Sequence, residues 1–519
     1  MANIAHVAEH TARDLIDHLP LLQVLVPFCT APVIVLFGSR RFAWPLAFIS
    51  SVISLIISVM LMIIVREGGY ISYTLGGWAP PLGIEYRIDA TNAFVLMLIS
   101  TIGTVVLPFA YTSIKNEIRN RDHTLLYACW MLCFTGLLGM VATGDAFNVF
   151  VFLEISSLST YVLVAQGASK DRRALTAAYD YLIMGTIGAT FFVIGLGMLY
   201  MATGTLNLAD LADRIADQGA NRTVRSGFAF VIVGMGLKVA MFPLHLWLPK
   251  AYTFAPSAVT VFLSATATKA ALYVVMRFVF SVYNPDFSFA KNTLEIIFLP
   301  LAIIAMFSAS FVAVFQVNMK KMLAYSSIAQ VGYMLLGIAI LNEAGLTASL
   351  LHMFNHGFAK ALLFMGAGVL VLKTGGSFYL QISGMGRKMP ITSGAIVIGG
   401  LSLIGVPGTA GFLSKWLLVQ AALERSADNS LFLVVLSSLL AVVYVWRIFE
   451  VLFLREADVS IPSSEAPIMM LIPMWILAGS CVWFGFSTDL LYDVANQAAL
   501  NLLEGSMGMS GSILNLGMN

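Results

Sequence analysis

The most regular feature of the chain is a succession of long apolar segments separated by short polar ones. A helix that crosses a bilayer needs about 20 mainly apolar residues, and helices of this length dominate the pattern. We therefore predict an all-α polytopic membrane protein with fourteen transmembrane helices, near 20–37, 42–65, 89–113, 124–143, 146–167, 174–202, 226–248, 254–282, 295–317, 320–341, 346–372, 391–420, 429–454 and 466–488. Between the second and third spans, residues 66–88 alternate as a β-hairpin does.

The composition also argues against soluble classes of protein. Hydrophobic residues make up 59% of the 519 residues and charged residues only 11%, which no soluble domain of this length matches. A net charge of +2 without a basic stretch gives no sign of nucleic-acid binding. Residues 1–18 are polar and amphipathic, so we expect no cleavable signal peptide. His6 and His10 in this segment have metal-ligand spacing, but a solvated helix face explains them better.

The distribution of lysine and arginine predicts the orientation of the chain. The odd-numbered loops hold fifteen of the 29 basic residues, whereas the N-terminal segment and the even-numbered loops hold eight. Basic residues are enriched in cytoplasmic loops. We therefore expect the odd-numbered loops in the cytoplasm. An even number of spans then places both termini on the outer side of the cell inner (plasma) membrane.

Motifs for cofactors and metals are missing from the sequence. The four cysteines (Cys29, Cys129, Cys133 and Cys481) lie in or near spans without a CxxC pair. We expect buried thiols, with no disulfide, zinc site or iron–sulfur centre. No glycine-rich phosphate-binding loop is present either. We predict a chain that holds no cofactor and no metal, and that carries no electrons itself.

Two predicted spans contain helix breakers. The seventh has Pro243 and Pro249, and the twelfth has Pro407 between glycines. Proline removes a backbone donor, and in lipid the freed carbonyl groups need partners from protein or water. Paired broken helices are typical of the transport path of membrane transporters built from repeats. Because spans seven and twelve are five apart, an odd number, a repeated five-helix unit would be inverted in the membrane.

This spacing predicts four parts of the chain. They are the first three spans with the outer loop, a first repeat of spans 4–8, a second repeat of spans 9–13, and the last span with the C-terminal tail. The corresponding ranges are 1–123, 124–282, 295–454 and 455–519.

Four charged residues lie deep within apolar segments: Glu154, Lys238, Lys269 and Lys415. A charged lysine at the bilayer centre costs about 2.5–3.5 kcal/mol even on lenient scales. Such residues are retained where their charge is used, and buried bases with a matching acid indicate a path for protons or cations. Snorkelling of the lysines to an interface, or a Glu154 satisfied by the backbone, is the less favoured interpretation.

Helical spacing groups further polar residues with these four. His352, His356 and Lys360 follow one another at intervals of four, which makes a stripe about 12 Å long. His245 lies two helical turns after Lys238 on the seventh span. Histidine titrates near neutral pH, and desolvation favours the neutral form of a lysine. Such groups are suited to pass protons through intervening water.

Purely structural roles are the alternative for some of these residues. His352 and His356 could serve only as hydrogen-bonding groups inside a helix bundle. Arg277 and Arg447, which lie near span ends, could simply snorkel to the interface.

Six stretches carry a resemblance to a known family. They are NVFVFLEISSLSTYVLV, GLKVAMFPLHLWLPKAY, FAPSAVTVFLSATATKAALYV, KKMLAYSSIAQVGYM, HMFNHGFAKALLFMGAG and GVPGTAGFLSKW. In their order, prolines and charged positions, the chain resembles the antiporter-like subunits shared by Mrp-type multisubunit cation/proton antiporters, respiratory complex I and membrane-bound hydrogenases. TGTLNLADLADRI and the lysine of GFLSKW look most like the D-type subunit of Mrp antiporters, although complex I subunits of the N and L type also carry that lysine.

The resemblance implies roles for the four buried charges. Glu154 is similar to the fifth-helix glutamate of the family, and Lys238 to its seventh-helix lysine partner. Lys269 resembles the eighth-helix lysine at the centre of the hydrophilic axis. Lys415 resembles the twelfth-helix base near the exit.

The same resemblance implies relay roles for four further residues. His352, His356 and Lys360 would connect the half-channels along the eleventh helix. His245 would help link the lysines of the seventh and eighth helices.

The chain departs from the family pattern in two places. Many relatives have WLPDAH where this chain has WLPKAY, with Lys250 in place of the acid. This departure puts the usual uptake route at that cytoplasmic corner in doubt. Asn318 replaces a common aspartate before Lys320 and Lys321.

The resemblance implies an electrostatic mechanism. With Glu154 close, the charged form of Lys238 is stabilised; when the pair opens, desolvation disfavours that charge and the proton passes toward Lys269 and then Lys415. Moving one charge across 100 mV involves about 2.3 kcal/mol, close to the energy of a pKa change of one or two units. The predicted function is proton translocation, coupled through other membrane subunits to the exchange of a monovalent cation, Na⁺.

Three other functions remain as alternatives. The chain could be the proton-pumping module of a redox complex such as complex I or a hydrogenase, which only its neighbouring subunits would reveal. It could transport an organic solute, but its midplane polar groups are nearly all titratable. It could be an inert scaffold, but retention of the four buried charges argues against this.

Overall fold

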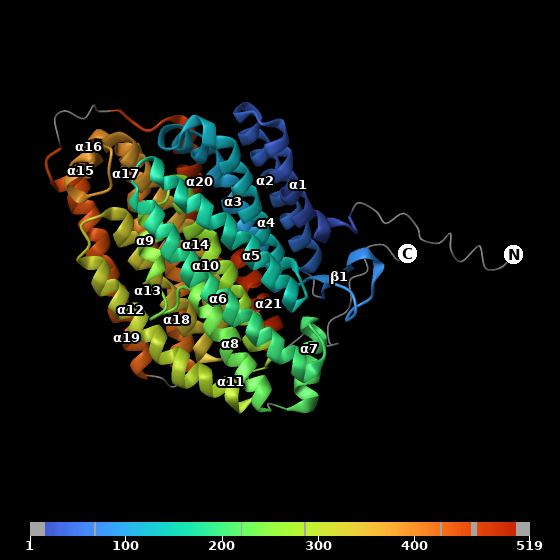
Figure 1. Ribbon diagram of the computed structural model, residues 1–519. Helices are drawn as coiled ribbons and strands as arrows, with labels where there is room; N and C mark the ends of the chain where they lie inside the picture. The colour runs from blue at the N-terminus through green and yellow to red at the C-terminus, as the bar shows by residue number, and fades with distance from the viewer. Residues whose placement is uncertain are drawn as a thin grey trace.

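The computed structural model describes residues 16–66, 69–219, 221–284, 287–425, 428–457 and 464–504. The expectation for His6 and His10 lies outside these residues. The described chain is almost entirely helical, which confirms the predicted fold class (Figure 1). Its helices are α1 (Leu19–Phe37), α2 (Arg40–Val65), α3 (Ala90–Glu117), α4 (His123–Ala142), α5 (Ala146–Ala165), α6 (Arg173–Thr203), α7 (Leu208–Gln218), α8 (Arg222–Val239), α9 (Trp247–Phe254), α10 (Ser257–Met276), α11 (Ser288–Thr293), α12 (Leu299–Val314), α13 (Met319–Ile340), α14 (Glu343–Thr374), α15 (Tyr379–Ile382), α16 (Met385–Lys388), α17 (Pro390–Ile404), α18 (Ala410–Glu424), α19 (Asp428–Phe449), α20 (Ile468–Phe486) and α21 (Asp489–Leu503).

Twelve helical segments of the described chain are long and apolar enough to cross a membrane. The other two predicted spans are the ones expected to be broken. The seventh consists of α8 and α9, and the twelfth of α17 and α18. Each first half ends in the left-handed conformation, at Ala240 with φ 61° and at Gly405 with φ 90°. The proline of each break follows within three residues, because a residue without a backbone donor cannot continue the helix.

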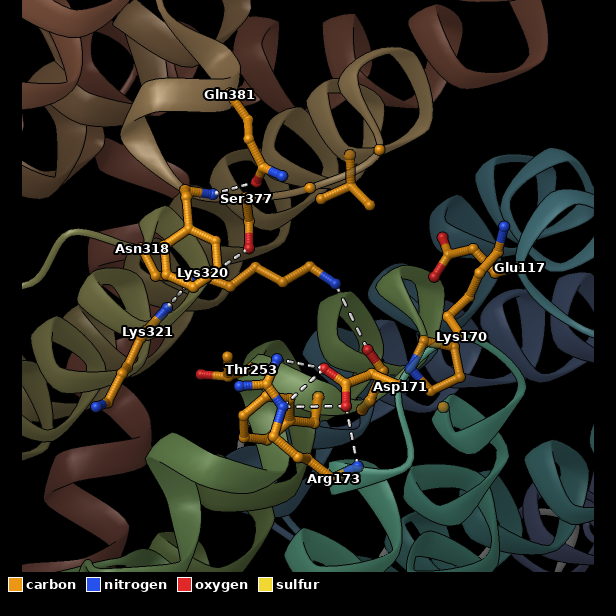
Figure 2. A pocket seen from close by; sticks show the side chains of 18 of the residues that line it. Glu117, Lys170, Asp171, Arg173, Thr253, Asn318, Lys320, Lys321, Ser377 and Gln381 are labelled. Atoms are coloured by element: carbon orange, nitrogen blue, oxygen red, sulfur yellow. Dashed lines mark hydrogen bonds and ion pairs between the residues drawn. The ribbon is translucent and has the colours of Figure 1, made fainter.

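The loops gather at two opposite ends of the bundle. Five odd-numbered loops line one pocket of about 670 Å³, which we call the odd-loop pocket (Figure 2). Even-numbered loops meet at the other end, where Gly144 N donates to Glu85 O over 2.8 Å and Arg425 pairs with Glu295 at 2.6 Å. Figure 1 shows α7 and the pair α15 and α16 at opposite ends of the molecule. This alternation agrees with fourteen crossings, the seventh and twelfth included.

The predicted hairpin between α2 and α3 is present at the even-loop end. Strand β1 (Ile71–Thr74) pairs antiparallel with β2 (Glu85–Ile88). Tyr86 of β2 also bridges to Thr143, so the hairpin covers the loop between α4 and α5.

A backbone hydrogen-bond pattern occurs twice, in the two predicted repeats. Asp145 caps α5 and bridges to Asn207, while Asn318 caps α13 and bridges to Phe378. The flanking bonds correspond as well. Ala146 N donates to Leu206 O and Leu208 N to Gly144 O in the first case, at 2.8 and 2.9 Å; Met319 N donates to Ser377 O and Tyr379 N to Val317 O in the second, at the same two distances. The pattern relates spans 5 and 6 to spans 10 and 11 and lies at opposite ends of the bundle, as an inverted repeat requires. The boundaries of the four predicted parts stay a prediction.

The centre of the bundle is formed by α3, α10, α13 and α14. Nearly every side chain of α10 and α13 is buried. α10 packs against both α3 and α14, and α14 packs against α13 and α18. The two predicted repeats therefore meet along α10 and α14, which carry Lys269 and the histidine stripe.

A buried ion pair joins α10 to the start of α3. Arg277, in a π-helical turn that continues α10, is 3% exposed and donates to Asp89. Its guanidinium also donates to Tyr273 Oη over 2.9 Å. Snorkelling of Arg277 is therefore wrong, because the side chain turns inward to a carboxylate. Arg447 is half-buried and donates to Val314 O over 2.5 Å.

We predict that Asp89→Asn destabilises the protein by about 3–5 kcal/mol, because the buried guanidinium loses its counter-charge while asparagine still caps α3. Thermal unfolding of the purified protein in detergent would measure this change. Arg121→Ala is the control: Arg121 pairs with Asp122 at 3.5 Å on the surface, and its loss should cost less than about 1 kcal/mol. Equal melting temperatures for the two variants would contradict the prediction.

Candidate functional site

The first part of the site lies between α5 and α8. Lys238, in the last turn of α8, donates from Nζ to Ser157 Oγ over 2.6 Å and to Tyr161 Oη over 3.4 Å. Both acceptors lie on α5, where Glu154, Ser157 and Tyr161 share one face because they are three and four residues apart. Glu154 interacts electrostatically with Lys238, but the two form no ion pair, and one Glu154 carboxylate oxygen is buried without a partner among the described residues.

A small cavity with a mixed polar and apolar lining borders Lys238. Its volume is about 30 Å³, and it is lined by Ser156, Ser157, Thr160 and Tyr181 as well as by two alanines of α10, Ala267 and Ala271. A water molecule needs about 10–15 Å³ and two to four polar partners. The cavity meets both conditions. It therefore offers room for water between Lys238 and the helix that carries Lys269.

The second part of the site surrounds His356 on α14. His356 is buried, and neither ring nitrogen has a hydrogen-bond partner among the described residues. Lys269, Lys360 and Lys415 all interact electrostatically with its ring. Lys269 is itself 1% exposed and donates to the backbone carbonyl of Ser264. The imidazole thus lies among three amines that come from three different helices.

The remaining members of the histidine stripe have hydrogen-bond partners. His352 contacts Ser414 Oγ at 2.9 Å and Gln330 Oε1 at 2.8 Å. Its ring stacks on that of His356, with a centroid distance of 6.0 Å. Lys360 is wholly buried and donates to Leu323 O over 2.8 Å and to Ser326 Oγ. The stripe predicted from the four-residue spacing is therefore a continuous line of polar groups along α14.

Lys415 occupies the break of the twelfth span. Its Nζ donates to the carbonyls of Leu403 and Ile404 at 3.1 and 2.8 Å, which are the last carbonyls of α17. These groups have no partner within the helix, and a cation is favoured at a helix C-terminus. Gly405 makes the approach possible, since a Cβ there would lie 2.9 Å from Lys415 Cδ. The broken helix thus creates the acceptor site that holds the ammonium.

His245 occupies the break of the seventh span. It lies in the turn between α8 and α9, is buried, and stacks on Phe242 with a centroid distance of 5.3 Å. Its Nδ1 has no hydrogen-bond partner among the described residues. A link from His245 to Lys238 or Lys269 stays a prediction.

Sequence reasoning missed two features of the site. Ser157 and Tyr161, not a carboxylate, bind the ammonium of Lys238. Their positions three and seven residues after Glu154, on the same helix face, are a signal that could have found them. Lys320 lies at the very start of the tenth predicted span, where a solvated lysine is expected, yet it is 4% exposed. Its burial depends on loops distant in sequence, which no local pattern reveals.

The comparisons with known proteins identify the family of the chain. Residues 143–441 match the family model described as NADH:quinone oxidoreductase/Mrp antiporter, transmembrane region. The chain belongs to this family. The match spans both predicted repeats and contains Glu154, every site lysine and the three site histidines.

Relatives of the chain are named either as subunits of NADH-quinone oxidoreductase or as subunits of Na⁺/H⁺ antiporters. The chain is 37% identical to NADH-quinone oxidoreductase subunit N of Desulforudis audaxviator, over 93% of this chain and 98% of the relative. It is 28% identical to the D-type Na⁺/H⁺ antiporter subunit of Alkalihalophilus pseudofirmus, over 94% and 98%. Among solved structures, a chain of the Mrp complex from Dietzia sp. DQ12-45-1b superposes with a TM-score of 0.88 at 24% identity, over 95% and 98%. The protein is thus a membrane subunit of the Mrp antiporter and complex I superfamily.

We predict ordered water at two points of the site. An imidazole needs one donor and one acceptor partner, and each missing partner costs about 1–3 kcal/mol in a buried position. A high-resolution cryo-EM map should therefore show water within hydrogen-bonding distance of both His356 nitrogens and in the cavity beside Lys238. Empty density at both points, in a map that resolves water elsewhere in the bundle, would contradict this.

Proposed function

We propose that the chain translocates protons along the line of buried groups from Glu154 and Lys238 through Lys269 to Lys415. The observation that carries this proposal is the placement of four buried lysines on four helices, none of them in an ion pair among the described residues. Lysines that serve only as structural cations are expected to have carboxylate partners. Lysines held by neutral oxygens keep the ability to lose a proton.

Relay groups fill the spaces between these lysines. The cavity between Lys238 and α10 supports transfer through water toward Lys269. His356 lies within electrostatic reach of Lys269, Lys360 and Lys415. In the proposed sequence a proton leaves Lys238, passes through water to Lys269, and continues by way of the histidines and Lys360 to Lys415. His245 assists the first of these transfers.

Glu154 controls the first transfer in this scheme. Its carboxylate interacts with Lys238 through space without a hydrogen bond. A small movement of α5 against α8 would close the pair and stabilise the ammonium, and the reverse movement would favour release of the proton. The energy involved is a few kcal/mol, similar to the 2.3 kcal/mol that one charge gains across about 100 mV.

The proton flux is coupled to cation exchange in this proposal. The chain acts as one subunit of a multisubunit monovalent cation/H⁺ antiporter of the cell membrane, with Na⁺ as the exchanged ion, odd-numbered loops in the cytoplasm and both termini outside. The relative named as a Na⁺/H⁺ antiporter subunit and the likeness to a chain of an Mrp complex support this. The subunit itself needs no cofactor for proton transfer between amines, imidazoles and water.

A redox-driven complex is the second candidate. The 37% identity with a protein named NADH-quinone oxidoreductase subunit N favours it, since identity with the antiporter subunit is 28%. The same lysine line would then be driven by electron transfer in other subunits. The geometry of this chain is compatible with either source of energy, because the proposed transfers take place between its own side chains and water.

We predict that Lys238→Met abolishes proton transport while the complex still assembles. Methionine has a similar length but no titratable group, so the first transfer fails. Proton movement is measured with a pH-sensitive dye in everted membrane vesicles, and assembly by the amount of chain in the purified complex.

Lys250→Met is the matched control. Lys250 follows in the same segment but is exposed and pairs with Asp180 at 2.6 Å, so its loss should leave transport intact. Normal transport by Lys238→Met would refute the proposal.

The two coupling modes predict different partners. We expect the complex, purified intact in mild detergent, to contain several small membrane subunits without redox cofactors when its chains are identified by mass spectrometry. Its proton flux should then depend on a gradient of Na⁺. Co-purifying iron–sulfur, flavin or nickel–iron subunits would contradict cation exchange and support the redox-driven alternative.

A further inference from the structure

The odd-loop pocket is a polar hollow in the middle of one end of the bundle. It has a volume of about 670 Å³ and brings together the ends of α3, α9 and α14 and the starts of α6 and α13 (Figure 2). Lys170, Arg173 and Lys321 lie at its margin with Asp171. Arg173 pairs with Asp171 at 2.6 Å, and this guanidinium holds the pKa of Asp171 below its usual value. The margin of the pocket is therefore charged.

Lys320 forms the floor of this pocket. Its side chain is directed inward, whereas that of the adjacent Lys321 runs away from it (Figure 2). The Nζ of Lys320 donates to Ser257 Oγ over 3.0 Å and to Ala255 O over 3.5 Å. Glu117 accepts from Ser257 N at 2.9 Å, so one carboxylate balances the charge nearby. Lys320 is thus a fifth buried lysine held by neutral oxygens, and the transport scheme does not yet use it.

Lys320 and the central site share helix α13. Leu323 and Ser326, whose oxygens bind Lys360, lie three and six residues after Lys320. The rise along the helix is about 4.5 Å to Leu323 and about 9 Å to Ser326. A path from pocket water to Lys360 therefore needs only one or two helical turns. Lys360 in turn lies beside His356, at the centre of the lysine line.

At the opposite end of the bundle, the hairpin covers the equivalent position. The repeated hydrogen-bond pattern aligns Asn318 with Asp145, so Gln316 and Val317 correspond to Thr143 and Gly144. Strand β2 covers Thr143 and Gly144, whereas Gln316 and Val317 line the odd-loop pocket.

The same alignment places Phe147 in the position of Lys320. The hairpin of β1 and β2 thus covers this position in the first repeat, where the counterpart of Lys320 cannot carry a proton. The other end is open and has a lysine at its floor.

We propose that the odd-loop pocket is the water-filled mouth of the proton path and that Lys320 exchanges protons between this water and Lys360. A proton leaves the ammonium of Lys320 through water and the Ser326 hydroxyl, and it is taken up by the neutral amine of Lys360. The neutral amine of Lys320 then takes up a proton from pocket water. This inference rests on the proposed function, which supplies the acceptor line beyond Lys360.

The test compares Lys320→Met with Lys321→Met in vesicles that contain the intact complex. Loss of a positioned proton-transfer group should lower the initial rate of proton transport at least about ten-fold. Lys321→Met should transport at the rate of the unmodified protein, because its exposed side chain points away from the floor.

Chemical rescue separates proton transfer from a structural role. Lys320→Cys should be as slow as Lys320→Met, and treatment with aminoethyl methanethiosulfonate, which rebuilds an amine of lysine-like length, should restore transport. Sulfonatoethyl methanethiosulfonate should not restore it. Neither reagent should change the rate of the complex with the native Lys320, which controls for Cys29 and the other native thiols. If Lys320→Met fails to assemble, rescue of the cysteine variant decides the question.

The outcomes distinguish this inference from the proposed function. Inactive Lys238→Met together with fully active Lys320→Met would overturn the pocket route and leave the lysine line in place. Full activity of both variants would overturn the proposed function itself. A Lys320→Cys rate that the aminoethyl reagent does not raise would also overturn the role of Lys320.

Discussion

Keeping a lysine ammonium inside a lipid-surrounded bundle is the constraint on which the rest of the structure depends. Each buried ion costs several kcal/mol unless oxygens replace its lost water. The chain supplies neutral oxygens from serine and tyrosine hydroxyls for Lys238 and from the freed carbonyls of α17 for Lys415. An amine that loses its proton can still donate to such acceptors. Neutral oxygens thus stabilise the charged amine without preventing loss of its proton. A broken helix is one source of such oxygens.

The two predicted repeats share a hydrogen-bond register but use it differently. The same pattern around Asp145 and Asn318 is covered by a hairpin at one end and left open at the other. The broken spans differ as well. Lys238 lies just before the break between α8 and α9, whereas Lys415 lies after the break between α17 and α18 and binds the last carbonyls of α17. An inverted pair of identical units would conduct equally in both directions. The differences between the two repeats make the two ends of the line of lysines unequal.

Much of this could be predicted from the sequence because apolar length, prolines and buried charges are local signals. The fourteen segments, the two breaks at Pro243 and Pro407, and the spacing of His352, His356 and Lys360 needed no tertiary information. The hydrogen-bond and ion-pair partners of those charges could not be predicted from the sequence. The inward turn of Arg277 toward Asp89 and the burial of Lys320 depend on residues about 190 and 65 positions away. Pairing Lys238 with Glu154 also overlooked the hydroxyls of α5, which need less desolvation than a second charge.

The most direct test asks whether Lys269 must lose its proton or need only be positive. Arginine keeps the charge and cannot be deprotonated in a protein. Proton transport by the intact complex should therefore be abolished in Lys269→Arg as fully as in Lys269→Met, with both variants present in the assembled complex at normal levels. Substantial transport by Lys269→Arg would mean that the central lysine acts as a fixed charge, and the line of proton-carrying amines would be wrong.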